Sequence, residues 1–145
     1  MKAKLNTWMN VLLGALLSLL GYSCSWMPVE YGVPMGDLTY EGTVTNDAQE
    51  PLPDIQILHR AGWKDGEGTS YWLEGADTLR TGSDGRFYKL YEGFQPFKYH
   101  MTIVHDPSGA YASDSVLSEV SYSGGKGAWY QGEATLDVKI ILRKK

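Results

Sequence analysis

Apolar and polar side chains alternate with a period of two along much of the chain beyond residue 36. The alternation is clearest in residues 38–45, 55–60 and 134–143, where one side of each segment is mostly apolar and the other is more polar. Successive side chains of a β-strand point to opposite faces of a sheet, so this pattern predicts strands that each bury one face. No apolar stripe at helical spacing follows Leu20, and the pattern therefore predicts an all-β domain.

Further β-rich runs occupy residues 97–105 and 116–122, and two more, residues 77–81 and 86–91, flank the sequence Gly82-Ser83-Asp84-Gly85. An Asp-Gly pair supplies the positive-φ positions of a tight turn, so we expect a β-hairpin across it. The Gly-rich segments 61–76 and 123–132 are predicted to be loops. About seven short strands separated by such turns are typical of an antiparallel β-sandwich.

The N-terminal residues have the organisation of a targeting segment. Lys2 and Lys4 precede the uncharged run Val11–Leu20, which is too short for a stable transmembrane helix but fits a signal-peptide helix. The single cysteine, Cys24, follows a small Ser23, as expected where a lipoprotein signal peptidase would cleave. The alternatives are an ordinary secretory signal with an incidental cysteine, or a buried N-terminal helix.

These features divide the chain into a lipoprotein signal peptide (1–23), a Pro- and Gly-containing tether (24–36) and one β-sandwich domain (37–145). Acyl groups on Cys24 would attach the protein stably to a membrane. No cluster of acids follows Cys24, which favours the periplasmic face of the outer membrane.

Charge excludes one class of partner. The chain has 13 Lys and Arg against 17 Asp and Glu, a net charge of −4. Removal of residues 1–23 takes away two lysines and leaves a 122-residue chain with a net charge of −6. Binding of nucleic acid requires clustered basic residues to neutralise phosphates, so no nucleic-acid partner is expected. The single cysteine also excludes an intramolecular disulfide.

Several segments resemble a known family. Tyr31-Gly32-Val33-Pro34, residues 40–45, residues 52–57 and Asp77-Thr78-Leu79 are similar to the radical SAM-associated lipoproteins of Bacteroidetes, and the resemblance covers essentially the whole chain. The hairpin sequence 81–87 also resembles the carboxypeptidase-regulatory or transthyretin-like domain. The resemblance implies an Ig-like or transthyretin-like β-sandwich and an association with a radical SAM enzyme, as partner or substrate. It assigns no catalytic residue.

The search for catalytic or metal-ligating groups gives a mostly negative result. His100 and His105 are separated by an odd number of residues, so a regular strand would place them on opposite faces. We therefore expect His59, His100 and His105 to be individually hydrogen-bonded or solvent-facing, with no metal site and no cofactor. No nucleophile-elbow motif is present in the sequence, and we predict a protein that is not an enzyme. A small secreted enzyme remains an alternative.

The remaining candidates are aromatic. Trp63, Tyr71 and Trp72 fall in the first predicted loop, and Trp129 and Tyr130 fall in the second. Loop aromatics can stack on sugars or peptides, because their flat apolar faces have polar edges. Alternatively, these rings fold back over the open ends of the sandwich. The sequence thus predicts a lipid-anchored cell-envelope accessory protein without catalysis, with a carbohydrate- or peptide-binding lipoprotein as the alternative.

Overall fold

The computed structural model describes residues 32–67 and 71–145. The predicted signal peptide, Cys24 and most of the tether lie outside the described residues. Within the described part, no helix is long and apolar enough to cross a membrane. The compact unit that contains the strands spans Val33–Lys145, so the predicted domain start at residue 37 lies four residues inside it.

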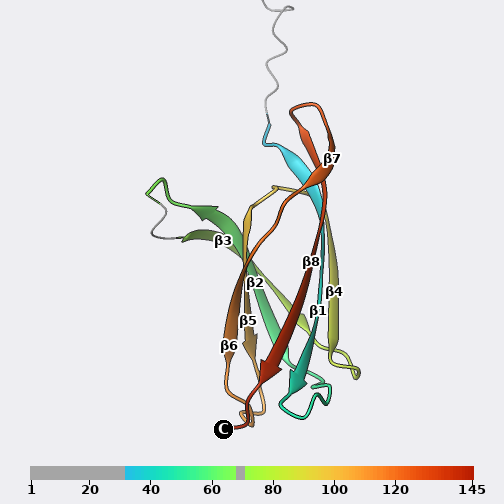
Figure 1. Cartoon of the computed structure of the whole chain (residues 1–145), viewed down its shortest axis with the longest axis vertical. Coiled ribbons are helices and arrows are strands. Elements are labelled where there is room, and N and C mark those ends of the chain that lie inside the picture. Colours follow the sequence, from blue (N-terminus) through green and yellow to red (C-terminus); the bar gives the residue numbers. More distant parts are fainter. Residues whose placement is uncertain (1–31, 68–70) are drawn as a thin grey trace, which may run out of the picture. The chain divides into compact units, whose positions relative to one another are not determined.

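The unit consists of eight strands in two four-stranded sheets (Figure 1). The strands are β1 (Met35–Asn46), β2 (Gln56–Lys64), β3 (Tyr71–Arg80), β4 (Arg86–Phe94), β5 (Tyr99–His105), β6 (Asp114–Glu119), β7 (Ser123–Lys126) and β8 (Tyr130–Leu142). One sheet has the order β4-β1-β8-β7 and the other β3-β2-β5-β6. The predicted all-β sandwich is confirmed, with one pairing, β1 with β8, that is parallel rather than antiparallel.

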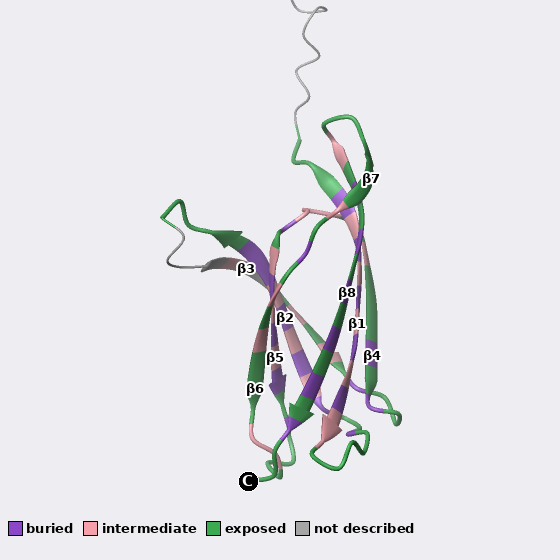
Figure 2. Cartoon of the chain, viewed as in Figure 1, coloured by how far each residue is buried: buried purple, intermediate pink, exposed green. Residues whose placement is uncertain are grey.

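The core lies between the two sheets and is built by the alternation in the sequence. Leu38, Tyr40 and Val44 of β1 are fully buried, and they pack in one cluster with Ile57 of β2 and Val104 of β5. Figure 2 shows buried positions alternating with less buried ones along β1, β2 and β8. Burial of this shared apolar surface is the main force that holds the two sheets together.

Strands β1, β4 and β8 approach one another very closely at Gly42. A Cβ atom at this position would collide with the backbone carbonyl of Val138 on β8, and it would lie 2.6 Å from Cζ of Phe87 on β4. Glycine is therefore required here for steric reasons.

The predicted hairpin across residues 77–91 is wrong. The turn forms, with Gly85 at a φ of 71°, but β3 pairs with β2 and β4 pairs with β1, so the turn connects the two sheets. The carbonyl of Gly85 accepts a hydrogen bond from the amide of Val44 at 2.8 Å, which aligns β4 with β1. An Asp-Gly pair predicts a tight turn, but the available strand edges determine the pairing.

Both predicted Gly-rich loops are largely wrong as well. The first contains the end of β2 and most of β3, whose register pairs Trp63 with Trp72. The second contains β7 and the start of β8. Gly132 has a φ of 100°, and a Cβ there would collide with the carbonyl of Ser123. Gly125 and Gly132 therefore allow two strands to approach closely, whereas Gly66, Gly124 and Gly127 have open space around them.

Strand β5 buries a polar face. The sequence groups Tyr99, Met101 and Ile103 on one side, but the side that faces the core carries His100, Thr102 and Val104. His105, on the opposite side from His100, is exposed, as the spacing of the two residues predicts. The inward orientation of His100 creates the site described below.

Candidate ligand-binding clefts

Two histidines that are 41 residues apart meet in the core. In the register of β2 and β5, His59 is opposite Thr102 and Ala61 is opposite His100, so the two imidazoles are diagonal neighbours on the same face. Nε2 of His59 lies 2.9 Å from Nδ1 of His100, and the rings are nearly parallel, with an interplanar angle of 6°. His59 is 4% exposed and His100 is 0% exposed. The prediction of three separate histidines therefore missed this pair.

Tyr40, on β1 of the other sheet, packs against the histidine pair. Its ring stacks on the imidazole of His59, with the ring centroids 4.2 Å apart. Its hydroxyl forms a buried 2.8 Å hydrogen bond with Oγ1 of Thr102. This contact gives both buried hydroxyls a partner and fixes the position of the rings.

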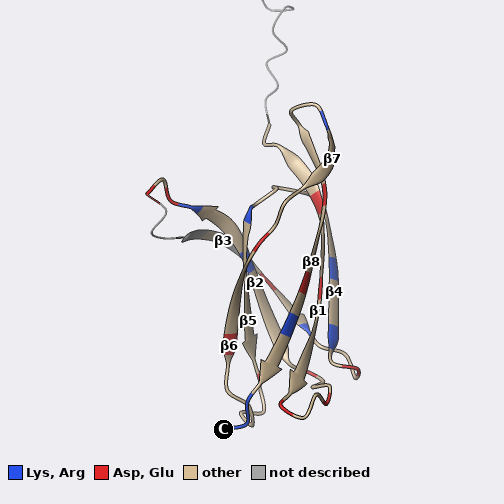
Figure 3. Cartoon of the chain, in the orientation of Figure 1, with Lys and Arg blue, Asp and Glu red and all other residues tan. Residues whose placement is uncertain are grey.

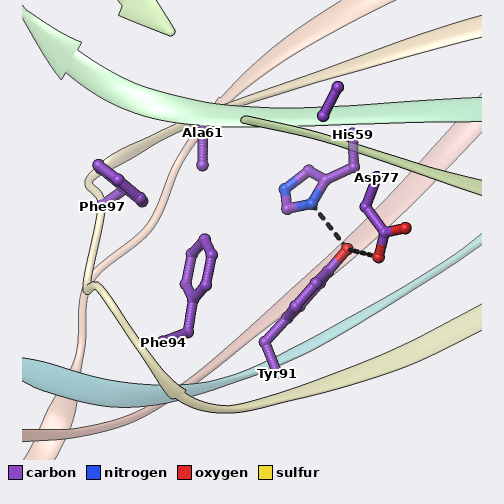
Figure 4. Close-up of a pocket in the computed structure, with 7 residues that line it drawn as sticks. His59, Ala61, Asp77, Tyr91, Phe94 and Phe97 are labelled. Atoms are coloured by element: carbon purple, nitrogen blue, oxygen red, sulfur yellow. Dashed lines mark hydrogen bonds between the residues drawn. The ribbon is translucent and has the colours of Figure 1, made fainter. Parts of the chain in front are cut away.

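The pair belongs to a longer series of hydrogen bonds, which we call the histidine chain: the carbonyl of Phe97, His100, His59, Tyr91 and Asp77. Nε2 of His100 lies 2.9 Å from the Phe97 carbonyl oxygen, and Nδ1 of His59 lies 3.1 Å from the Tyr91 hydroxyl. The Tyr91 hydroxyl in turn donates to Oδ2 of Asp77 at 3.0 Å (Figure 4). The histidine chain therefore runs from β5 and β2 of one sheet to Tyr91 on β4 of the other sheet. It ends at Asp77 on β3, in the first sheet again.

Burial determines the protonation states of the imidazoles and the phenol in the histidine chain. Desolvation lowers the pKa of His59 to about 4, with a further contribution from neighbouring His100, and the nearby Asp77 opposes the shift. Desolvation also lowers the pKa of His100, against the effect of its hydrogen bond to the Phe97 carbonyl. The pKa of Tyr91 is raised, first by burial and then by Asp77. At neutral pH both imidazoles are therefore uncharged and the phenol keeps its proton.

The exposed end of the histidine chain forms one wall of a cavity of about 350 Å³, which we call the His59 cleft. The cleft is lined by His59, Ala61, Ala76, Asp77, Tyr91, Phe94 and Phe97. Figure 4 shows Phe94 and Phe97 on one side and the polar atoms of His59, Tyr91 and Asp77 on the other. The ring of Phe94 lies 5.2 Å from that of Tyr91 and 5.3 Å from that of Phe97, measured between centroids. A largely apolar cavity with a few polar groups at one end is typical of small-molecule sites.

A second cavity, of about 620 Å³, is the Trp63 cleft. It is lined by Pro34, Trp63, Gln95, Pro96, Lys98, Val120, Ser121, Tyr122 and Gln131. Trp63 is 42% exposed, and its ring makes a T-shaped contact with that of Phe97 at a centroid distance of 4.6 Å. The buried hydroxyl of Tyr122 has no hydrogen-bond partner among the described residues, and burial raises its pKa to about 12.

The aromatic residues proposed from the sequence are distributed over several places. Trp63 lines the Trp63 cleft, whereas the side chains of Tyr71 and Trp72 lie outside the described part of the chain. Trp129 and Tyr130 line neither cleft. The hydroxyl of Tyr130 donates to Oδ2 of Asp37 at 2.8 Å, and this bond raises the pKa of Tyr130 to about 12.

Sequence reasoning missed the histidine chain because its members come from four strands. One signal pointed to it: His59 continues the inward face of Ile55 and Ile57, so the alternation itself buries a polar side chain. Across residues 32–67 and 71–145, no three His, Cys, Asp or Glu side chains converge in a way that would hold a metal ion.

The eight strands and two sheets define a two-layer β-sandwich. A scan against family models found no match, and a search of curated protein sequences found none either. Among solved structures, the chain is similar to 3-chlorocatechol 1,2-dioxygenase from Rhodococcus opacus, with a TM-score of 0.51, 14% identity and coverage of 82% of this chain and 64% of that chain. Catechol 1,2-dioxygenase from Pseudomonas arvilla gives a TM-score of 0.51 at 9% identity, with coverage of 79% and 54%.

Catechol 1,2-dioxygenase from Acinetobacter radioresistens gives a TM-score of 0.50 at 12% identity and covers 79% of this chain and 59% of that chain. This chain therefore spans less than two thirds of the length of these proteins. At such low identity the similarity shows a shared β-sandwich fold.

Proposed function

We propose that this protein is a lipid-anchored β-sandwich accessory protein of the cell envelope, without catalytic activity, and that it binds a short glycan in the Trp63 cleft. The observation that carries the proposal is the composition of this cleft. An exposed indole lies beside the unpaired hydroxyl of Tyr122 and the amide side chains of Gln95 and Gln131.

Each of these groups suits a sugar. The face of Trp63 provides a flat apolar surface for stacking on the C–H face of a pyranose. The Tyr122 hydroxyl and the two glutamine amides supply donors and acceptors for sugar hydroxyls. A buried hydroxyl without a partner is unfavourable, and a ligand that bonds to it removes that cost. A peptide is the alternative ligand of the same cleft.

The absence of catalysis is supported by the arrangement of the buried histidines. All four ring nitrogens of His59 and His100 are within hydrogen-bond distance of another group of the protein. A general base must be able to accept a proton from a substrate, and neither imidazole has a nitrogen available for this. The dioxygenase reaction named for the structural neighbours is the competing function, and we test it directly below.

The lipid anchor and the radical SAM partner are proposed from the sequence alone. Cys24 would carry the acyl groups, and the resemblance to radical SAM-associated lipoproteins supports such an enzyme as partner or modifying enzyme. Figure 3 shows basic and acidic residues interspersed over the strands, in accordance with an expected lack of nucleic-acid binding.

Intact-mass spectrometry of the native protein tests the anchor. We expect a chain that begins at Cys24 and carries a diacyl or triacyl group, whereas an unmodified N-terminus at Met1 would contradict lipidation. Peptide mapping after co-expression with the radical SAM enzyme tests modification, since a substrate would gain a mass change beyond the lipid. An unchanged peptide map would show that the protein is not a substrate of the radical SAM enzyme, and only the role of binding partner would then remain.

Glycan-array binding tests the ligand. Trp63→Ala should abolish binding, and Tyr122→Phe should weaken it, because each removes one contact of the Trp63 cleft. Tyr88→Ala is the matched control, since Tyr88 is an exposed aromatic residue of β4 outside both clefts. Binding that survives Trp63→Ala would refute the glycan site. Oxygen consumption with catechol, in the presence of first-row transition-metal salts, should remain at the level of the salts alone.

A further inference from the structure

Strand β4 lies at an edge of its sheet. In the order β4-β1-β8-β7 its only partner among the described strands is β1, and the register with β1 is regular from Arg86 to Tyr91 (Figure 1). An edge strand has a row of backbone N–H and C=O groups that no neighbouring strand satisfies, so it can pair with a further strand. The residues along this edge determine which strand fits it.

The backbone groups that face the free edge follow from the pairing of β4 with β1. The amide of Val44 donates to the carbonyl of Gly85 at 2.8 Å. Hydrogen-bonded and non-hydrogen-bonded positions alternate along an antiparallel pair, so the odd-numbered residues of β4 bond to β1 and the even-numbered residues direct their groups away from it. In accordance with this, the carbonyl of Arg86 accepts from an amide of the preceding turn. Tyr88 and Leu90 therefore direct their N–H and C=O groups to the free edge.

The same positions carry the exposed side chains of β4. Tyr88 is 61% exposed and Leu90 is 43% exposed, and both lie on the outer face of the sheet, where Tyr88 is opposite Glu41 of β1. Arg86 and Glu92 follow the same spacing of two on either side, and both are exposed. In the described part of the chain, neither of these two has an ion-pair partner. The outer side of β4 thus has the order base, aromatic, aliphatic, acid.

This order is complementary to itself when two copies of β4 run antiparallel. A two-fold axis at Lys89 places Arg86 opposite Glu92 of the second copy and Tyr88 opposite Leu90 of the second copy, and the symmetry repeats each pair. Opposite charges and aromatic–aliphatic pairs that face each other across two strands stabilise their pairing. These even-numbered positions are also the ones whose backbone groups face the free edge, so the side chains and the hydrogen bonds require the same register.

Other registers and edges are less suitable. An axis at Tyr88 would place Arg86 opposite Leu90, and an axis at Leu90 would place Glu92 opposite Tyr88, so each leaves the charges unmatched. A shift by one residue would set outer side chains against inner ones. Of the other edge strands whose side chains are described, β6 carries two acids and no base, and β7 carries no acid.

We propose that β4 pairs with β4 of a second copy of this chain, in the antiparallel register centred on Lys89, and so forms a two-fold symmetric dimer. The sheet β7-β8-β1-β4 of one copy then continues into the sheet β4-β1-β8-β7 of the other. This inference is independent of the glycan site, because no residue of β4 lines the Trp63 cleft.

Lys89 opposes this pairing, because the axis brings the ammonium groups of the two copies close to each other. Like charges that face each other across strands are destabilising, and an inward lysine is one way in which edge strands limit their association. Oδ2 of Asp77 lies 3.7 Å from Nζ of Lys89, and this carboxylate offsets part of the repulsion. Lys89 therefore weakens the dimer without preventing it, and Lys89→Gln should tighten the dimer.

Sedimentation velocity of the full-length protein in non-ionic detergent, over a series of concentrations, tests the dimer. We expect a reversible equilibrium between monomer and dimer. Arg86→Glu and Glu92→Arg should each weaken it about tenfold, because each sets like charges opposite each other twice. The double variant restores opposite charges in the reverse order and should recover the wild-type dissociation constant. Lys139→Glu, which reverses an exposed charge on β8, is the matched control and should leave dimerisation unchanged.

Two results of this experiment would overturn the proposal. One is a protein that remains monomeric at every concentration. The other is a dimer that the single charge reversals do not weaken, or that the double variant does not restore. All three changed residues are exposed in the monomer, so the variants are expected to fold and each result is informative.

Disulfide cross-linking tests the register. Residue 89 lies on the axis in a non-hydrogen-bonded pair, whose Cα atoms are about 4.5 Å apart, and a disulfide can bridge this distance. Lys89→Cys should therefore give a covalent dimer after oxidation with copper phenanthroline. Lys139→Cys is the matched control, because β8 lies between β1 and β7 inside the sheet, and the wild type shows the background from Cys24. Equal cross-linking in the two variants, or none in Lys89→Cys, would contradict the proposed register.

Discussion

Lowering the pH from 7 to 5 should destabilise the fold through His59. The imidazole of His59 has an ordinary pKa of 6.5 when the chain is unfolded and a pKa of about 4 in the fold, where it is desolvated beside His100. The unfolded chain therefore takes up a proton near pH 6.5 and the folded chain does not, so the free energy of unfolding decreases as the pH falls towards 4. These two values give a loss of about 2 kcal/mol between pH 7 and pH 5. His100, whose pKa is also lowered, adds a loss of the same sign.

Urea unfolding followed by tryptophan fluorescence at a series of pH values measures this effect. Carboxylates also titrate in this range, so the useful quantity is the difference between the wild type and His59→Gln. The variant should be less stable at pH 7, because it loses the stacking on Tyr40, but its stability should depend less steeply on pH. His105→Gln is the control, since His105 is exposed. An equal loss of free energy between pH 7 and pH 5 in the wild type and in His59→Gln would show that His59 does not cause the pH dependence.

Two other changes test the packing around the histidine chain. Tyr40→Phe should lower the free energy of unfolding by about 1–3 kcal/mol, because it leaves the buried hydroxyl of Thr102 without a partner. Tyr88→Phe, which changes an exposed residue, should have no effect in the same urea titration. Gly42→Ala should destabilise the fold by about 3 kcal/mol or prevent folding, because its Cβ meets backbone that cannot move, while Gly66→Ala, with open space around it, should be neutral in thermal unfolding.

Much of the fold could be predicted from the sequence because it depends on local alternation. The inward faces of β1 and β8 follow directly from the period of two, and Leu38, Tyr40 and Val44 are buried as that pattern requires. Pairing was not predictable in the same way. The Asp84-Gly85 turn is present, but the choice of β1 as the partner of β4 depends on the contact between Gly85 and Val44, which are distant in sequence.

The candidate site could be predicted to a smaller extent. Trp63 does line a cleft, but the cleft also needs Gln95 and Tyr122, which come from other elements. The histidine chain depends on the register between β2 and β5, and a shift of one residue would turn His100 out of the core. No local pattern specifies that register, so His59 and His100 could be identified singly but not as a pair.

His59 and His100 form a buried pair of imidazoles 2.9 Å apart, and nitrogen NMR of the two rings measures their protonation states. Long-range ¹H–¹⁵N correlation spectra at pH 7 distinguish the two neutral tautomers from the imidazolium. We predict that His59 and His100 are both neutral at pH 7, because burial lowers the pKa of each imidazole. An imidazolium signal from either ring at pH 7 would contradict this prediction.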